Sequence, residues 1–286
     1  MLTLGFNLVV SITLSTYPKI GITTPPLTRQ ENTTLMPKPL ILVTNDDGIR
    51  APGLKLLANA LSTIADVRVY APDRERSAVS HGVSLHHPLR VTRLKENWYM
   101  VDGTPVDCVM LAVRELLGRK PDLVVSGVNP GANLGDDVTY SGTMAGAREG
   151  MLLGVPAIAM SDVSHRPKHM DTAAQVAVKL AQYVLAHGLQ KDTALNVNVP
   201  DVPFDALQGA AITRMGQRDY MDEILERKDP RGRKYYWIGG SAPTHICEAG
   251  TDFEAIEADK VSITPIGRDT TQHNALETLN DLPLTF

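Results

Sequence analysis

Two adjacent aspartates, Asp46 and Asp47, are the first residues of this chain whose types suggest chemistry. They follow an apolar run at residues 39–43 that is typical of a buried strand, and Gly48 after them permits a sharp turn. Neighbouring carboxylates repel each other unless a cation lies between them. We interpret the pair as ligands of a divalent cation. The alternative, a turn and helix cap before Pro52, accounts for one acid but hardly for both.

Further oxygen-bearing side chains follow two other expected strands. Ser77 lies in the loop after a strand at residues 66–70, and Asn129 lies in the loop after a strand at 123–126. Loops at the carboxyl ends of parallel strands meet at one edge of the sheet, so these side chains are expected near the aspartates. Oxygen ligands suit magnesium, manganese or calcium better than zinc. Taken singly, Ser77 more often caps a helix and Asn129 more often forms a turn.

A segment of small residues, Ser141, Gly142 and Thr143, opens an expected helix at residues 144–153. Free amide groups and the helix dipole at such a helix start favour an anion. No Lys follows the glycines, so the segment is not a Walker loop, and its spacing does not match a dinucleotide fingerprint. Its small residues are explained equally well by close packing of the helix on the sheet.

The elements that position these residues alternate between strands and helices from residue 38 to about 205. Apolar residues recur at helical spacing in 52–64 and 171–186, with Asp171 as the expected cap of the second helix, and the Thr-Pro-x-Asp motif at 104–107 predicts a capped helix start. Further strands are expected at 85–94 and 98–101, which form a hairpin, and at 157–160, 195–199 and 261–265. The alternation predicts an α/β fold with a doubly wound, mostly parallel sheet covered by helices on both faces.

Three segments are expected along the chain. Residues 1–35 are rich in Thr and Pro in their second half, and we interpret them as a disordered leader or a mis-assigned start upstream of Met36, with a targeting segment as the alternative. Residues 36–205 are expected to form the α/β domain that carries the candidate catalytic residues. Residues 206–286 form a β-rich C-terminal extension, whose polar and aromatic arm at 214–240 is expected to pack on the domain or on another subunit.

Composition limits the partners that this chain can have. It has 286 residues, of which 43% are hydrophobic and 21% charged, with a formal net charge of −4. This balance is typical of a globular protein and lacks the basic surface that a nucleic-acid polymer needs. The two cysteines provide no disulfide framework, which favours a cytoplasmic location, and no apolar stretch reaches the length of a membrane helix, so no membrane partner is expected.

Four motifs occur in order between residues 39 and 266: ILVTNDDGIRAPG, APDRERSAVS, SGVNPGANLGDDVTYSGTMAGAREG and YYWIGG. Together they resemble the survival protein E (SurE) family of 5′/3′-nucleotidases. The resemblance implies a Rossmann-like domain with a C-terminal extension that exchanges between subunits, giving homodimers or homotetramers. It also implies divalent-metal-dependent hydrolysis of nucleoside monophosphates, and in some members of short-chain polyphosphate.

The resemblance assigns roles to particular residues. It implies that Asp46, Asp47, Ser77 and Asn129 hold one Mg²⁺ or Mn²⁺ per subunit, and that one of the two aspartates is also the catalytic proton acceptor. Phosphate oxygens are then expected at the Ser141-Gly142-Thr143 segment, with Asn133 nearby. Two rival functions remain: a phosphatase that forms an aspartyl phosphate, which usually needs acids two residues apart and a later Lys, and a non-catalytic nucleotide or metal sensor.

Overall fold

The computed structural model describes residues 38–219, 224–238, 244–246, 248–280 and 282, and all of these belong to one compact unit, Lys38–Phe286. The expected leader at 1–35 lies outside the described residues, and so do parts of the expected arm at 214–240.

The main sheet has nine strands in the described part of the chain. Their order is β3 (Val91–Lys95), β4 (Trp98–Val101), β2 (Asp66–Pro72), β1 (Leu40–Thr44), β5 (Leu123–Pro130), β6 (Ala157–Asp162), β7 (Thr193–Val199), β13 (Val261–Gly267) and β8 (Ala210–Ile212). From β4 through β7 every neighbouring pair is parallel, whereas β3 is antiparallel to β4 and β13 is antiparallel to β7. The mostly parallel sheet that the sequence predicts is therefore confirmed.

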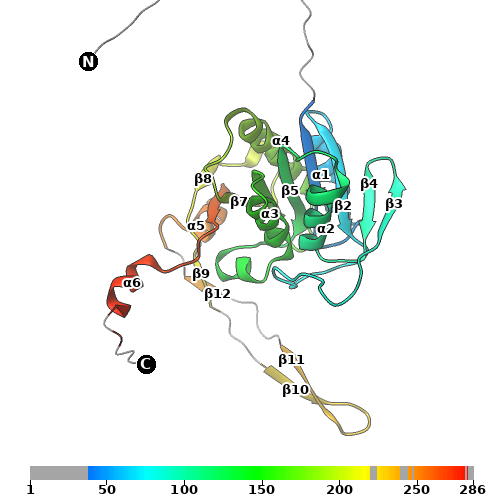
Figure 1. Cartoon of the computed structure of the whole chain (residues 1–286). Coiled ribbons are helices and arrows are strands. Elements are labelled where there is room, and N and C mark those ends of the chain that lie inside the picture. Colours follow the sequence, from blue (N-terminus) through cyan, green and yellow to red (C-terminus); the bar gives the residue numbers. More distant parts are fainter. Residues whose placement is uncertain (1–37, 220–223, 239–243, 247, 281, 283–286) are drawn as a thin grey trace, which may run out of the picture. The chain divides into compact units, whose positions relative to one another are not determined.

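Helices cover both faces of this sheet (Figure 1). The helices α1 (Pro52–Leu61) and α4 (Met170–His187) pack together on one face, and α2 (Pro105–Leu111) packs with α3 (Gly142–Leu152) on the other. Side chains alternate between the two cores along each strand, as in β1, where Ile41 and Val43 join the α1/α4 core and Leu42 joins the α2/α3 core. The doubly wound α/β fold is confirmed.

The residues after 205 contribute to the main sheet as well as to smaller elements. Two short antiparallel pairs form there, β9 (Gln217–Asp219) with β12 (Thr244–Ile246) and β10 (Ile224–Lys228) with β11 (Lys234–Ile238). The other elements are a π-helical turn (Ala112–Leu116), two 3-10 turns (Gly135–Thr139 and Phe204–Ala206), α5 (Asp252–Glu257) and α6 (His273–Leu279). The expected turn at 229–232 closes the β10–β11 hairpin, since Gly232 N donates to Asp229 O at 2.9 Å. The C-terminal segment is thus β-rich, but β8 and β13 make it part of the same compact unit as the catalytic domain.

Two expected elements have other bounds than predicted. Helix α1 stops at Leu61 and not at 64, because the hydroxyls of Ser62 and Thr63 donate to the carbonyls of Asn59 and Ala60, at 2.6 and 2.7 Å, and close the helix early. The first hairpin strand begins at Val91 and not at 85, because Pro88 lacks the N–H that a strand ladder requires.

The expected cap of α4 is also different. The N-cap residue is His169, without a side-chain cap, and Asp171 lies within the first turn. The carboxylate of Asp201 performs the capping from a distant loop, since it accepts hydrogen bonds from Lys168 N and from His169 N, the latter at 2.7 Å. A partner that lies 32 residues away along the chain is not recognisable from local sequence.

Candidate functional site

The acidic pair lies at the carboxyl end of β1, where Gly48 turns the chain with a φ of +95°. Asp46 is buried, and its Oδ1 accepts a short hydrogen bond from the Thr143 hydroxyl of α3. Burial raises the pKa of Asp46, and the hydrogen bonds from Thr143 oppose this effect. Helix α3 thus holds the first carboxylate in place.

Hydrogen bonds from its own backbone and from Asn45 act on the Asp47 carboxylate, but only one of its oxygens is paired. Its Oδ2 is buried and has no hydrogen-bond partner among the described residues. Burial, followed by the negative charges of Asp46 and Glu75, raises the pKa of the Asp47 carboxyl to about 7. A buried oxygen that lacks a partner fits a cation, because a positive charge at Oδ2 would offset both the burial and the neighbouring carboxylates.

Two neutral oxygen side chains lie against the same cavity as the aspartates, which has a volume of about 500 Å³. The Ser77 hydroxyl donates to Glu75 Oε1 at 2.9 Å. The Asn129 amide donates from Nδ2 to the carbonyl of Gly131 at 2.8 Å, so its orientation is fixed and its Oδ1 is the atom left to act as a ligand. Six of the eight predicted site residues line this one cavity: Asp46, Asp47, Ser77, Asn129, Asn133 and Ser141.

The other two predicted residues, Gly142 and Thr143, contact Asp46. A Cβ on Gly142 would lie 2.8 Å from Asp46 Oδ2, so only glycine fits beside this carboxylate. The N-cap residue of α3 is Ser141, whose Oγ accepts from Met144 N at 3.0 Å. The start of α3 therefore faces the cavity with a hydroxyl that retains its own proton to donate.

Close packing, the alternative explanation for the small residues, also holds further along α3. A Cβ on Gly146 would lie 2.9 Å from Ser126 Oγ, and a Cβ on Gly150 would lie 2.8 Å from Val124 Cγ2. These two glycines let α3 approach β5, whereas the first turn of the helix borders the cavity. The two explanations apply to different turns of the same helix.

Asn133 is held in a buried polar network at the carboxyl ends of β6 and β7. Its Nδ2 donates to Ser161 Oγ at 2.7 Å, and its backbone carbonyl accepts from the side-chain amides of Asn196 and Asn198 at 2.8 and 3.0 Å. The network fixes Asn133 at the wall of the cavity and leaves one Nδ2 hydrogen for a ligand. Its role in binding phosphate stays a prediction.

Four polar lining residues were not singled out from the sequence: Glu75, Asp137, Tyr140 and His165. Glu75 lies between two arginines, Arg74 and Arg76. Both arginines pair with Asp73, at 3.7 and 3.2 Å. The Glu75 carboxylate instead accepts the hydrogen bond from the Ser77 hydroxyl. Glu75 therefore adds negative charge to the site. Asp137 lies in the 3-10 turn before α3, and Tyr140 and His165 lie in loops.

The donor set limits which cation fits. In the described part of the chain, no cluster of three or more His, Cys, Asp or Glu side chains is placed to hold a metal ion. A cation beside Asp46 and Asp47 therefore needs neutral oxygens to complete its coordination, and Ser77 and Asn129 supply them at the same cavity. Such a set of hard oxygen donors fits Mg²⁺ or Mn²⁺ better than Zn²⁺.

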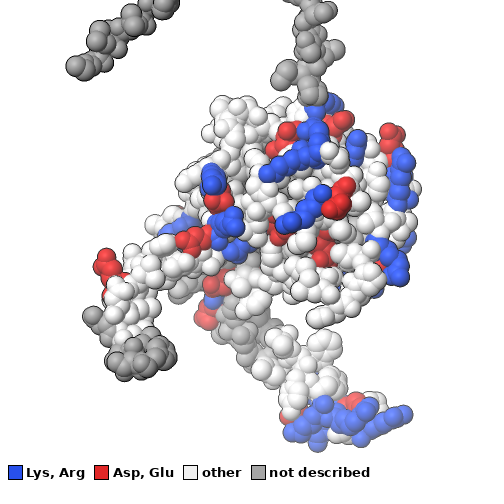
Figure 2. All heavy atoms as spheres, in the orientation of Figure 1, with Lys and Arg blue, Asp and Glu red and all other residues white. Residues whose placement is uncertain are grey.

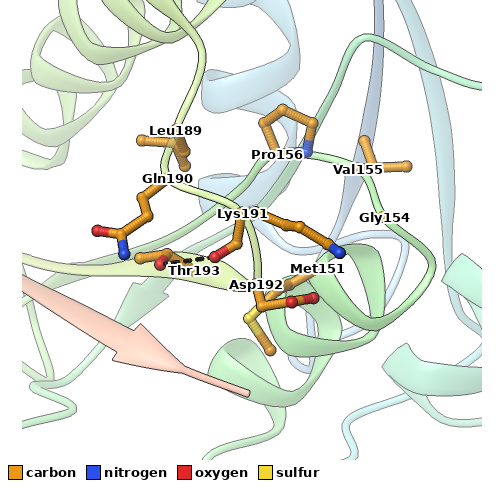
Figure 3. Close-up of a pocket in the computed structure, with 9 residues that line it drawn as sticks. All are labelled: Met151, Gly154, Val155, Pro156, Leu189, Gln190, Lys191, Asp192 and Thr193. Atoms are coloured by element: carbon orange, nitrogen blue, oxygen red, sulfur yellow. Dashed lines mark hydrogen bonds between the residues drawn. The ribbon is translucent and has the colours of Figure 1, made fainter. Parts of the chain in front are cut away.

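A second region, at the opposite edge of the sheet, has a cavity of about 250 Å³ (Figure 3). It lies between the end of α3 and the starts of β6 and β7, and its lining includes Gly154, Lys191 and Asp192. Asp192 pairs with Arg268 at 3.6 Å. This cavity has neither a helix N-terminus nor a buried acid pair, so its lining does not suggest chemistry.

The doubly wound sheet and the oxygen-lined cavity at its carboxyl edge define a Rossmann-like α/β protein with a site suited to a cation and an anion together. Residues 41–222 match the family described as "Survival protein SurE". The chain belongs to this family, which confirms the resemblance seen in the sequence.

Relatives support the same assignment over most of the chain. A protein of Pelobacter propionicus named 5′-nucleotidase SurE is 52% identical over 84% of this chain and 97% of its own length. A protein of Geobacter sulfurreducens with the same name is 52% identical over 86% of this chain and 94% of its own. The crystal structure of the SurE protein from Aquifex aeolicus is similar with a TM-score of 0.76 at 39% identity, covering 85% of this chain and 98% of that one. Among the described residues, no helix is long and apolar enough to cross a membrane.

Proposed function

We propose that this protein hydrolyses nucleoside 5′-monophosphates to nucleoside and phosphate with the help of a divalent cation, Mg²⁺ or Mn²⁺, one per subunit. The observation that carries the proposal is the buried Asp47 Oδ2, which lacks a partner among the described residues and lies in a cavity beside the start of α3. The names of the relatives, 5′-nucleotidase SurE, support the substrate class.

The residues that would hold the cation are Asp46, Asp47, Ser77 and Asn129. When bound there, a divalent cation neutralises phosphate charge and lowers the pKa of water. Within the chain, Thr143 fixes Asp46 through its hydroxyl, and the Asn129–Gly131 hydrogen bond of 2.8 Å fixes the direction of the Asn129 amide. The ligand oxygens are therefore oriented before substrate arrives.

Other groups of the chain act on the phosphate and on the attacking water. The first turn of α3 offers the Ser141 hydroxyl to phosphate oxygens, and its dipole favours their negative charge. One of the two adjacent aspartates at this cavity accepts a proton from the attacking water. Direct attack by water fits these groups better than an aspartyl phosphate, since the acids are adjacent and not two residues apart.

Phosphate release tests the proposal. The purified chain is incubated with AMP, GMP, 3′-AMP and tripolyphosphate, each with Mg²⁺, with Mn²⁺, with Ca²⁺ and with excess EDTA. We expect release from the 5′-monophosphates with Mg²⁺ or Mn²⁺, poor release with Ca²⁺, whose looser coordination orients water less well, and none in EDTA. Undiminished release in EDTA would contradict the metal-assisted reaction. No release from any monophosphate with any metal would favour the sensor, and a trapped phosphoenzyme would favour the aspartyl phosphate.

We further propose a homodimer or homotetramer in which the β10–β11 hairpin contacts another subunit. Its side chains Tyr236, Trp237 and Ile238 are 56, 64 and 88% exposed, which is unusual for large apolar residues. The hairpin also carries five Lys or Arg against two acids in a chain of net charge −4, and Figure 2 shows this basic cluster. Opposite charge on a second copy would favour association.

Light scattering tests the assembly. We expect a mass of at least twice 31.1 kDa for the natural chain, and a lower mass for Trp237→Asp with unchanged circular dichroism. A natural chain that scatters as a monomer at micromolar concentration would contradict the proposal. We propose a cytoplasmic location for the same protein, since Cys108 is a free and buried thiol; cell fractionation checks it.

A further inference from the structure

The carboxyl edge of the sheet has a second cavity, of about 610 Å³, which adjoins the one that contains the aspartates. The two cavities share Asp137 and His165 as lining residues. Asp137 comes from the 3-10 turn before α3, and His165 comes from the loop after β6. A ligand whose phosphate lies beside Asp47 can therefore extend past these two side chains into the second cavity.

The walls of the second cavity have the composition of a binding site for a flat, mostly apolar group. Apolar side chains from three segments line it: Ala132, Leu134, Val163 and Ile256. Aromatic rings line it as well, from His245 on β12 and Phe253 on α5. The other lining residues are polar: Asp137, His165, Arg218 and Glu257. Apolar and aromatic walls with a few placed polar groups are typical of pockets for heterocyclic ligands.

The two aromatic rings form a fixed platform. The rings of His245 and Phe253 are stacked with centroids 4.3 Å apart and planes 8° apart. His245 Nε2 lies 2.7 Å from Glu257 Oε1, so the edge of the ring is held too. Phe253 is only 2% exposed, whereas the His245 side chain is 28% exposed. The aromatic surface that a ligand in the cavity can touch is therefore that of His245.

Arg218 stabilises the wall that the two cavities share. Its guanidinium binds the Asp137 carboxylate, with Nε at 2.9 Å from Oδ2, and lies 5.2 Å from the centre of the Phe253 ring. Its backbone N–H donates to Asp136 Oδ2 at 2.9 Å. One residue thus ties the 3-10 turn to the aromatic platform, which keeps the second cavity in a set position relative to the first.

We propose that the second cavity binds the nucleobase of a nucleoside monophosphate, with the base stacked on His245 and the ribose between Asp137 and His165. This inference rests on the proposed function. An aromatic ring that is held on one face and at one edge loses little freedom when a base stacks on it, so it contributes to affinity. Phosphate esters that lack a base have no group for this cavity and gain nothing from the platform.

Steady-state kinetics with a matched pair of substrates tests the inference. AMP has a base and ribose 5-phosphate has none, and both present the same 5′-phosphate. We expect His245→Ala to raise KM for AMP about tenfold with little change in kcat, and to leave ribose 5-phosphate unaffected. His245→Phe keeps an aromatic ring and should restore a KM for AMP near that of the natural chain. Ile246→Ala, on the same strand and 52% exposed, is the control for damage to β12.

The outcomes separate this inference from the proposed function. If the natural chain hydrolyses AMP and His245→Ala changes KM for both substrates equally, or for neither, the base lies elsewhere and the inference is wrong. If the natural chain hydrolyses no monophosphate, the proposed function fails, and calorimetric binding of AMP decides the inference. Weaker AMP binding by His245→Ala than by Ile246→Ala would support it, and equal binding by the two variants would overturn it.

Discussion

The two edges of the central sheet differ in chemistry although each has a cavity beside α3. At the carboxyl edge, the cavity of about 500 Å³ contains an acid whose pKa is raised to about 7 and whose Oδ2 lacks a partner among the described residues. At the amino edge, the cavity of about 250 Å³ contains Asp192, which is paired with Arg268. Both cavities are open to a small ligand, so the presence of a hollow does not indicate function.

The direction of the chain explains the difference. Helices α3 and α4 begin near the carboxyl ends of the strands, where amide groups and positive dipole ends favour anions. The same helices end near the amino edge, at Gly154 and Gly188, which have φ values of +71° and +74°. The ends of helices present carbonyl groups, which repel a phosphate. In a parallel sheet covered by helices, the carboxyl edge therefore favours phosphate binding, and the amino edge, where the helices end in turns, does not.

Removing a carboxylate should give the largest difference in turnover between variants at the two edges. We expect Asp46→Asn and Asp47→Asn each to lower kcat for AMP by more than about 100-fold, because the cation loses a charged ligand and the reaction a proton acceptor. Asp192→Asn at the amino edge is the control and should stay within about twofold of the natural chain. An Asp47→Asn variant with natural turnover at saturating Mn²⁺ would contradict the assigned site.

Adding a methyl group at each edge gives the next largest effect. Gly142→Ala places a Cβ 2.8 Å from Asp46 Oδ2 and should lower kcat about tenfold or more by displacing that carboxylate. Gly154→Ala has more room but forces alanine to a φ of +71°, so it should cost about 1 kcal/mol of stability and leave turnover unchanged. Equal turnover in the two variants would show that the position of Asp46 is not critical.

The pH dependence of stability distinguishes the edges without substrate or metal. The pKa of Asp47 is about 7 in the fold against an ordinary value of 3.8, so the folded chain binds more protons between these values. This group therefore destabilises the metal-free protein progressively as pH rises from about 4 to 7. We expect Asp47→Asn to stabilise the protein by about 2 kcal/mol at pH 8 and by about zero at pH 4. Urea unfolding in EDTA measures the free energy of unfolding of both proteins at each pH. If the variant exceeds the natural chain by the same amount at pH 8 and at pH 4, the charged Asp47 carboxylate does not destabilise the fold.

The smallest effects are expected at the neutral ligands. Ser77→Ala and Asn129→Ala should each weaken Mn²⁺ binding, measured by calorimetry, about tenfold, since a neutral oxygen contributes less than a carboxylate. Thr193→Ala at the amino edge is the matched control and should leave Mn²⁺ affinity unchanged. If all three variants bind Mn²⁺ equally, the neutral ligands lie elsewhere.

Periodicity and local motifs were enough to predict the fold class. The apolar run before Asp46 and the helical spacing after Pro52 correspond to β1 and α1, and the Thr104–Asp107 motif forms a capping box with a 2.8 Å bond from Thr104 N to Asp107 Oδ2. Six of the eight predicted site residues line one cavity because loops after parallel strands meet at one edge of the sheet. In both cases the signal is local along the chain.

Long-range partners were beyond the reach of the sequence. Nothing near Asp171 indicates that Asp201 caps α4, and nothing near Arg218 indicates its hydrogen bonds to Asp137, 81 residues away. The second cavity was missed for the same reason, because its lining comes from segments between 132 and 257 that meet only in the fold. The partial burial that raises the pKa of Asp47 likewise depends on packing and not on neighbours in sequence.

The carboxylate of Asp252 accepts hydrogen bonds from two loop amides, Gly135 N and Gly216 N, each at 2.8 Å. Gly135 precedes Asp252 by 117 residues. A ribosome synthesises the chain from its N-terminus, so β1 to β7 emerge long before the two hydrogen bonds to Asp252 can form. During translation, the Gly135 amide lacks this partner until α5 leaves the exit tunnel. A nascent chain therefore carries its aspartates early but completes the wall beside them only near the end of synthesis.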